Sequence, residues 1–238
     1  MKDSSRQNVL INSFALKLAE AGLKIKAIKL NPEQPFQWAS GYFMPIYNDN
    51  RMFLFYPEYR NLIIDGFLNI IKIKDIKVEV IAGTSTAGIP HGMSLANKLN
   101  LPFIYIREKP KLHGLKNQIE GIDDDSNLAD KKIVVIEDLI STGGSSARAV
   151  QAVRNANGVV DYCLSIFSYG LLSAINEFNN LSKPCQVIPI LTYDILIETA
   201  IKAKYITEGQ AQILREWRLD PFGWGAKAGF PKVMSKVL

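Results

Sequence analysis

Two adjacent carboxylates and a turn of small residues occupy residues 137–145. The four β-forming residues Ile133–Ile136 precede Glu137 and Asp138, and the turn Ser141–Ser145 leads into a helical pattern. Backbone N–H groups in such a turn at a helix N-terminus bind phosphate. Neighbouring carboxylates accept hydrogen bonds from vicinal sugar hydroxyls. This segment therefore offers a phosphate site beside a diol site, the two features that a ribose 5-phosphate needs.

The same residues also fit an ordinary strand, acidic turn and helix, which many α/β proteins contain. The spacing excludes two other phosphate motifs, because it matches neither the P-loop nor the Gly-x-Gly-x-x-Gly dinucleotide pattern. The string Glu-Asp-Leu-Ile-Ser-Thr-Gly-Gly-Ser closely resembles the phosphoribosyl-pyrophosphate (PRPP) signature of the type I phosphoribosyltransferases. Within them it is most similar to the orotate phosphoribosyltransferases.

This resemblance implies a ligand, a reaction and a set of contacts. PRPP would donate its ribosyl group through an electron-poor sugar while pyrophosphate leaves. Mg²⁺ would enter bound to PRPP, with no direct protein ligand, and would stabilise the leaving group together with cationic side chains. Ser141 would also touch orotate. The residues implied to bind PRPP here are Glu137, Asp138, Leu139, Ile140, Ser141, Thr142, Gly143, Gly144 and Ser145.

A long polar segment leads from Ile106 to the signature strand. Its length, about 25 residues, is typical of active-site lids, although a solvated charge run fits it as well. Arg107, Lys111 and His113 have the Arg-x-x-x-Lys-x-His-Gly spacing of the catalytic loop in the orotate enzymes. The resemblance implies that all three bind PRPP and that Lys111 and His113 are catalytic. It also implies a homodimer in which the Arg107–Gly121 loop closes over the neighbouring subunit's site.

A second loop of small residues follows the strand expected at Val78–Ala82. Its glycines allow close approach of the backbone, and it enters a helix. An ordinary tight turn explains it equally well, but it resembles the family's pyrophosphate loop. Ala87 stands where some members carry a lysine, so a charge contact is missing there. The residues implied to bind pyrophosphate are Thr84, Ser85, Thr86, Ala87 and Gly88.

The segment Phe36–Arg51 combines aromatic residues with a Ser-Gly turn and ends in Asp-Asn-Arg. On its residues alone it reads as an exposed turn and a short strand. It resembles the hood that covers the base in the orotate enzymes, where aromatic rings stack on a flat pyrimidine. Ser40 and Gly41 are accordingly implied to bind orotate. No arginine stands near Tyr169, where one subgroup binds the orotate carboxylate, so the group that binds this carboxylate is unassigned.

Alternation of strands and helices predicts an α/β fold with a mostly parallel sheet flanked by helices. The resemblance makes this a type I phosphoribosyltransferase fold with a mobile catalytic loop and a small hood. We expect one domain over residues 1–238, with a core at about 56–192 and a hood from about 1–55 and 193–238. The expected strands are Val78–Ala82, Pro102–Ile106, Ile133–Ile136, Val159–Phe167 and Gln186–Leu191. The expected helices are Val9–Leu23, Pro57–Ile73, Ile89–Leu99, Leu171–Phe178, Asp194–Ala203 and Thr207–Leu219.

The composition and charge of the chain restrict the classes of partner that it is expected to bind. The chain has 47% hydrophobic and 21% charged residues and a formal charge of +5, with its basic residues scattered. This suits a small polyanionic substrate and gives no indication of nucleic-acid binding. No apolar run is long enough for a membrane span or a signal sequence, so we expect a cytoplasmic protein.

The expected function is transfer of phosphoribose to orotate, a step of UMP biosynthesis. Two alternatives are a phosphoribosyltransferase for another base and a non-catalytic regulator that senses PRPP. The cations of the Arg107–Gly121 loop argue against the regulator. A fused decarboxylase is not expected, because the segment from Tyr193 is too short for a barrel.

Overall fold

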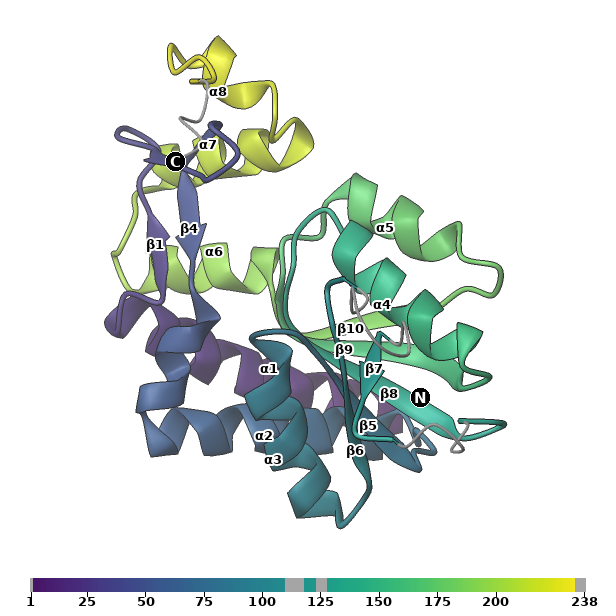
Figure 1. The fold of residues 1–238 in the computed structure, drawn as a ribbon. Helices are drawn as coiled ribbons and strands as arrows, with labels where there is room; N and C mark the ends of the chain where they lie inside the picture. Colours follow the sequence, from purple (N-terminus) through teal and green to yellow (C-terminus); the bar gives the residue numbers. More distant parts are fainter. Residues whose placement is uncertain (1, 110–117, 123–127, 234–238) are drawn as a thin grey trace.

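A six-stranded sheet forms the centre of the larger lobe, in the order β10-β9-β8-β5-β6-β7 (Figure 1). The computed structural model describes residues 2–109, 118–122 and 128–233, with side-chain surroundings from residue 12 onward. All neighbouring strands are parallel except β7, which runs antiparallel to β6 at the edge. The predicted mostly parallel sheet is therefore confirmed. The strands are β5 (Val80–Thr84), β6 (Phe103–Ile106), β7 (Ile119–Glu120), β8 (Lys132–Ile140), β9 (Val159–Ser168) and β10 (Gln186–Thr192).

Helices cover both faces of this sheet (Figure 1). In the central strand β8, Val134 and Ile136 face one core, whereas Ile133 and Val135 face the other. This alternation has the period of two that a strand imposes, and burial on both faces explains the unbroken apolar run. The first core is covered by α1 (Lys2–Lys24), α2 (Pro57–Ile73), α3 (Gly88–Leu99) and α6 (Tyr193–Lys202), and the second by α4 (Gly144–Asn155) and α5 (Leu172–Asn179).

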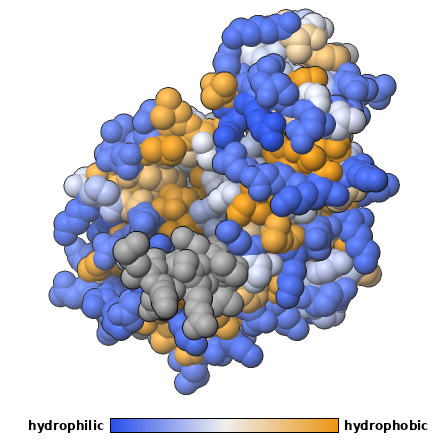
Figure 2. Space-filling model, turned by 180° about the vertical axis from the view of Figure 1, so that it is seen from behind, coloured by the Kyte–Doolittle hydropathy of each residue, from blue (hydrophilic) through white to orange (hydrophobic). Residues whose placement is uncertain are grey.

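A smaller lobe combines segments that follow α1 with the C-terminal part of the described chain. Met44 accepts a hydrogen bond at Sδ from Trp217 Nε1 (3.1 Å), and the backbone N–H of Val233 donates to Gly41 O (3.0 Å). Gly41 has φ +84°, and a Cβ there would lie 2.0 Å from Val233 O, so this contact requires glycine. The elements are β1 (Ile28–Leu30), β2 (Phe36–Gln37), β3 (Phe43–Met44), β4 (Ile46–Asn48), the 3₁₀ helix η1 (Asn50–Phe55), α7 (Glu208–Leu219) and α8 (Trp224–Lys227). In Figure 2 this lobe lies above the α/β body, and the visible surface of that body mixes hydrophilic and hydrophobic residues.

Several element bounds differ from those predicted. The helix expected at Val9–Leu23 begins at Lys2, and the strand expected at Val78–Ala82 lies two residues later, at Val80–Thr84. More important for the site, the signature strand does not end at Ile136 but continues to Ile140. Glu137 and Asp138 therefore lie within the strand, which stays paired with β9 as far as Ile140. In the described part of the chain, no helix is both long enough and apolar enough to cross a membrane.

Candidate active site

A pocket of about 310 Å³ opens at the carboxyl ends of β5, β6 and β8. Open α/β sheets bind their ligands at this edge. The pocket contains acidic, basic and hydroxyl groups drawn from four segments that are distant in sequence. Its lining residues are Thr84, Ser85, Ile106, Arg107, Glu108, Gln118, Glu137, Asp138, Leu139, Ser145, Arg148 and Ala149.

Glu137 is a buried carboxyl group of β8 that connects this strand with β5 and α4. Only 8% of the residue is exposed. Its Oε1 accepts hydrogen bonds from Thr84 Oγ1 (2.8 Å) and from the backbone N–H of Asp138 (3.0 Å), and its Oε2 accepts one from Ser146 Oγ (2.8 Å). Burial, and then the charge of Asp138, raises the pKa of Glu137 to about 8. These bonds use three of the roughly four acceptor positions of a carboxylate, so one position on Oε2 remains for the predicted contact with a ribose hydroxyl.

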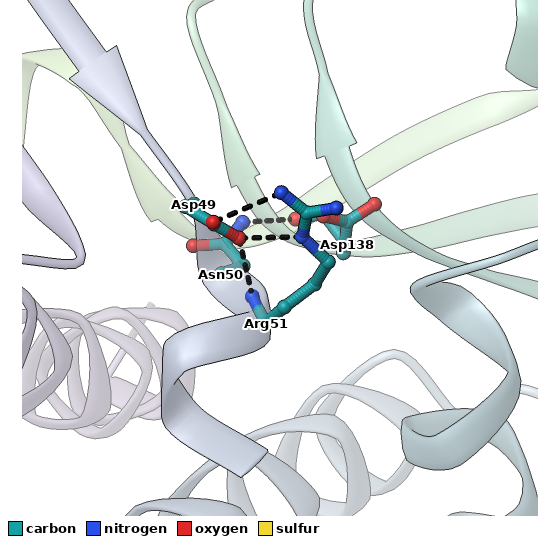
Figure 3. A network of polar contacts seen from close by, with 4 residues as sticks. All are labelled: Asp49, Asn50, Arg51 and Asp138. Atoms are coloured by element: carbon teal, nitrogen blue, oxygen red, sulfur yellow. Dashed lines mark hydrogen bonds and ion pairs between the residues drawn. The ribbon is translucent and has the colours of Figure 1, made fainter. Parts of the chain in front are cut away.

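The Asp-Asn-Arg segment lies against the strand at Asp138 (Figure 3). Asn50 Nδ2 donates to the backbone carbonyl of Asp138 (2.7 Å). Arg51 forms a two-pronged ion pair with Asp49, through Nε (2.7 Å) and Nη2 (2.9 Å), and this pair lowers the pKa of Asp49. Burial raises the pKa of Asp138, and hydrogen bonds to its carboxyl group, followed by the charge of Arg51, partly oppose that shift. A segment from the N-terminal part of the chain thus supports the acidic pair.

The turn predicted to bind phosphate leads directly into α4. Gly143 has φ +86°, and a Cβ there would lie 2.8 Å from the Cα of Ala174, so α5 packs too closely for a side chain. Ser145, in the first turn of α4, lines the pocket, whereas Thr142, Gly143 and Gly144 do not. The side chain of Ile140 is buried in the second core, and its backbone carbonyl accepts a hydrogen bond from the N–H of Tyr169 (3.2 Å). The N-terminus of α4 nevertheless lies at the pocket, as a phosphate site requires.

Arg148 is a pocket residue that the motif comparison did not single out. It lies one turn after Gly144 on α4, and its Nη1 is 3.4 Å from the position of a Cβ at Gly144. The guanidinium therefore folds back toward the start of the helix. Its side chain is exposed and forms no hydrogen bond or ion pair with the residues that the structure describes. A basic residue one turn inside a helix that follows a phosphate turn is the signal that could have identified it.

Arg107 lies at the opposite wall, where the polar segment leaves β6. Its Nη1 is 3.3 Å from Glu120 Oε1, and its backbone N–H donates to Gln118 O (2.8 Å). Gln118 in turn donates from Nε2 to the carbonyl of Arg107 (2.8 Å). The two ends of the segment are thus held together at the pocket. Lys111 and His113, the predicted catalytic residues, lie outside the described residues.

The predicted pyrophosphate loop is only partly at the pocket. Thr84 and Ser85 line it, and Ser85 Oγ accepts a hydrogen bond from the backbone N–H of Glu108 (3.0 Å). Thr86, Ala87 and Gly88 do not line it. Gly88 begins α3, and a Cβ there would lie 2.4 Å from Ile136 O, so its glycine permits close packing of helix on strand.

A second pocket, of about 490 Å³, lies on the other side of Leu139. Ser40 and Ser141, two residues predicted to bind orotate, are brought together in its lining. Gly41 is not part of the lining and instead contacts Val233. Aromatic rings form much of the wall, as stacking on a flat base would require. The lining residues are Gln37, Trp38, Ala39, Ser40, Tyr47, Asn48, Leu139, Ser141 and Tyr169.

Comparison with known proteins identifies the family. Residues 57–168, from α2 through β9, match the model of the phosphoribosyl transferase domain. An orotate phosphoribosyltransferase of Cytophaga hutchinsonii is 44% identical over 212 residues, which are 89% of this chain and 99% of the relative. One of Streptococcus gordonii is 46% identical over the same shares. This chain belongs to the orotate phosphoribosyltransferase family.

The fold of this family member agrees with that assignment. The crystal structure of orotate phosphoribosyltransferase from Aeropyrum pernix superposes with a TM-score of 0.66 at 23% sequence identity. The match covers 80% of this chain and 99% of the other. At that identity the likeness shows the fold, and it confirms the predicted type I phosphoribosyltransferase architecture.

Proposed function

We propose that this chain catalyses the reaction for which its family is named. It transfers the 5-phosphoribosyl group from PRPP to orotate and yields orotidine 5′-phosphate and pyrophosphate. The observation that carries the proposal is the pair of pockets that share Leu139. One is polar and charged and suits PRPP, and the other is walled by aromatic rings and suits a planar base. Their common wall is the signature strand, where ribose and base must meet.

Each pocket wall has a distinct task in this reaction. The backbone and hydroxyl of Ser145 at the start of α4 bind the 5-phosphate. Asp138 faces the sugar and stabilises its developing positive charge. Arg107, with Lys111 and His113 from the loop beyond it, binds the pyrophosphate that leaves. Closure of this loop excludes water that would otherwise hydrolyse PRPP.

Mg²⁺ fits the donor chemistry of the PRPP pocket. Asp138 offers a carboxylate there, and Mg²⁺ is typically bound by one or two carboxylates together with substrate phosphates. When bound, the ion neutralises charge on the leaving pyrophosphate. The residues that the structure describes contain no cluster of three or more metal-ligating side chains. We propose that Mg²⁺ arrives bound to PRPP, and Asp138 is one of the carboxylates in the pocket where this complex would bind.

The first test is the absorbance of orotate on mixing the protein with PRPP and Mg²⁺. Loss of orotate absorbance that requires PRPP is expected, and a Lys111→Ala variant should lose most of this activity. Uracil and hypoxanthine serve as control bases. Turnover of a control base in place of orotate would favour a phosphoribosyltransferase for another base. Binding of PRPP with no turnover of any base would favour a PRPP-sensing regulator.

We also propose that the loop acts across a homodimer, in the cytoplasm. The test mixes two inactive variants, Lys111→Ala and Asp138→Asn, after denaturation and joint refolding. Half of the refolded dimers should contain one copy of each variant. If the loop serves the partner's site, each of these mixed dimers has one complete site. Roughly a quarter of wild-type activity should then return. If the loop serves its own subunit, the mixture stays inactive.

A further inference from the structure

Tyr169 and Tyr193 are two buried tyrosines of one aromatic cluster that differ in what their hydroxyls bind. Each is 1% exposed, and both rings pack edge-on or tilted against Trp217. The hydroxyl of Tyr193 donates to Leu214 O (2.9 Å), as buried hydroxyls normally do. The hydroxyl of Tyr169 has no hydrogen-bond partner among the residues that the structure describes, and it is not one of the polar atoms that are fully shielded from solvent. An unpaired hydroxyl that remains accessible on a residue only 1% exposed calls for an explanation.

The explanation lies in the position of Tyr169, because it lines the base pocket. Its backbone N–H donates to Ile140 O (3.2 Å), which holds it beside Ser141 at the end of the signature strand. Its ring is held by Trp38, Phe167, Tyr193 and Trp217, with centroids 5.1–6.3 Å away. Burial raises the pKa of Tyr169 far above its usual value, so the phenol remains a neutral donor. This is a rigid donor prepared for a ligand.

Asn48, at the end of β4, repeats the pattern in the same pocket. Its Nδ2 and Oδ1 are both shielded from solvent and have no hydrogen-bond partner within the described parts of the chain. An amide with an unused donor beside an unused acceptor complements a ring edge on which a carbonyl stands beside an N–H. Pyrimidines with an imide group have such an edge, and asparagine reads the comparable edge of adenine in the same way.

The lining of this pocket also lacks cationic side chains, as far as the described residues go. An anionic base bound there is therefore held by neutral donors. Tyr169 is the most deeply buried of the candidates, whereas Ser40 is exposed and Ser141 half-buried. Neutral donors bind a carboxylate well, since the charge strengthens each hydrogen bond.

We propose that Tyr169 and Asn48 are the specificity-determining residues of the base pocket. The hydroxyl of Tyr169 donates to the carboxylate of the base, and the amide of Asn48 pairs with the imide edge of its ring. This inference rests on the proposed function, because it takes the second pocket as the orotate site. Tyr169 thus supplies the contact to the orotate carboxylate for which the sequence offers no arginine.

The first test compares Tyr169→Phe with Tyr193→Phe. Phenylalanine keeps the ring contacts and removes one oxygen atom. For Tyr169→Phe, the KM for orotate should rise by about 10- to 100-fold, the cost of a hydrogen bond to a charged group. The KM for PRPP and the thermal midpoint should stay unchanged. Tyr193→Phe should do the reverse, lowering the thermal midpoint without changing the KM for orotate. An unchanged KM for orotate in Tyr169→Phe would overturn its assignment.

The second test uses orotate methylated at the imide nitrogen, together with Asn48→Ala. The wild-type protein should reject the methylated base relative to orotate, and the variant should lose about 10-fold or more of this discrimination. Asn97→Ala, at an exposed position of α3 outside both pockets, is the matched control that should keep it. Equal discrimination in wild type and Asn48→Ala would overturn the role of Asn48. If the wild-type protein does not turn over orotate at all, the proposed function itself fails, which the same assay reveals beforehand.

Discussion

The hydroxyl of Thr84 at the end of β5 lies 2.8 Å from Oε1 of Glu137 in β8. This hydrogen bond therefore connects the start of the loop predicted to bind pyrophosphate with the start of the PRPP signature segment. We expect Thr84→Val, which keeps the shape and removes the donor, to lower the free energy of unfolding by about 1–3 kcal/mol. Urea denaturation measures this change. Ser94→Ala removes an exposed hydroxyl that bonds within its own helix and should cost less. Equal costs in the two variants would contradict the special role of Thr84.

The raised pKa of Glu137 predicts a dependence of stability on pH. Its pKa is about 8 in the folded protein and near the ordinary 4.5 when unfolded. The folded state therefore binds the proton more tightly. This contribution to stability is fully present below pH 4.5 and is lost as the pH rises through 8. The thermal midpoint should fall over that window. In Glu137→Gln, which stays neutral, the fall should be smaller, and a fall of the same size in both proteins would place its cause elsewhere.

Arg148 is expected to contribute to the binding of PRPP. Its unpaired guanidinium folds toward the start of α4, where a phosphate would lie. Arg148→Gln should raise the KM for PRPP by about 10-fold, the lower end for a charge-assisted hydrogen bond, and leave the KM for orotate unchanged. Arg215→Gln changes an exposed arginine of α7 outside the pocket and is the matched control. A rise in the KM for PRPP in both variants would indicate only an effect of overall charge.

Removal of divalent metal should abolish turnover. With EDTA in excess over all divalent ions, we expect no consumption of orotate, and added Mg²⁺ should restore it. The rate should follow the concentration of the Mg²⁺–PRPP complex, because the metal is proposed to arrive with that substrate. Titration calorimetry should accordingly detect no tight binding of Mg²⁺ to the protein without PRPP. Tight binding to the protein alone would contradict this route.

Local patterns in the sequence predicted the architecture well. The helix Pro57–Ile73 was predicted with its observed bounds, since proline marks its first turn and apolar residues recur at helical spacing. The central strand was found because it is buried on both faces. Its end was misplaced, because two consecutive acidic residues ordinarily indicate a turn. Hydrogen bonds from the hydroxyls of Thr84 and Ser146, which no local pattern announces, help to bury Glu137 inside the strand.

The sequence offered candidate site residues only where a motif could be recognised along the chain. Ser40 and Ser141 do meet in one pocket, although 100 positions separate them. Tyr169 and Asn48 could not be singled out in the same way. No sequence motif marks a single tyrosine or asparagine in a strand-rich segment. These two residues stand out because their polar atoms have no hydrogen-bond partner among the described residues. That absence of a partner becomes visible only when the surrounding side chains are in place.

Arg107 and Gln118 hydrogen-bond to each other and so fix both ends of the segment between them. The number of residues in that segment limits how far it can extend from the pocket. Ten residues lie between these two anchors. An extended chain spans at most about 3.4 Å per residue, so the eleven Cα–Cα steps between the anchors limit the reach of the backbone to roughly 19 Å from its base. Any second subunit that the segment serves must present its PRPP pocket within that distance plus the length of a side chain. The length of one loop thus restricts how two copies of the protein can pair, and an insertion there would relax the restriction without altering the sheet.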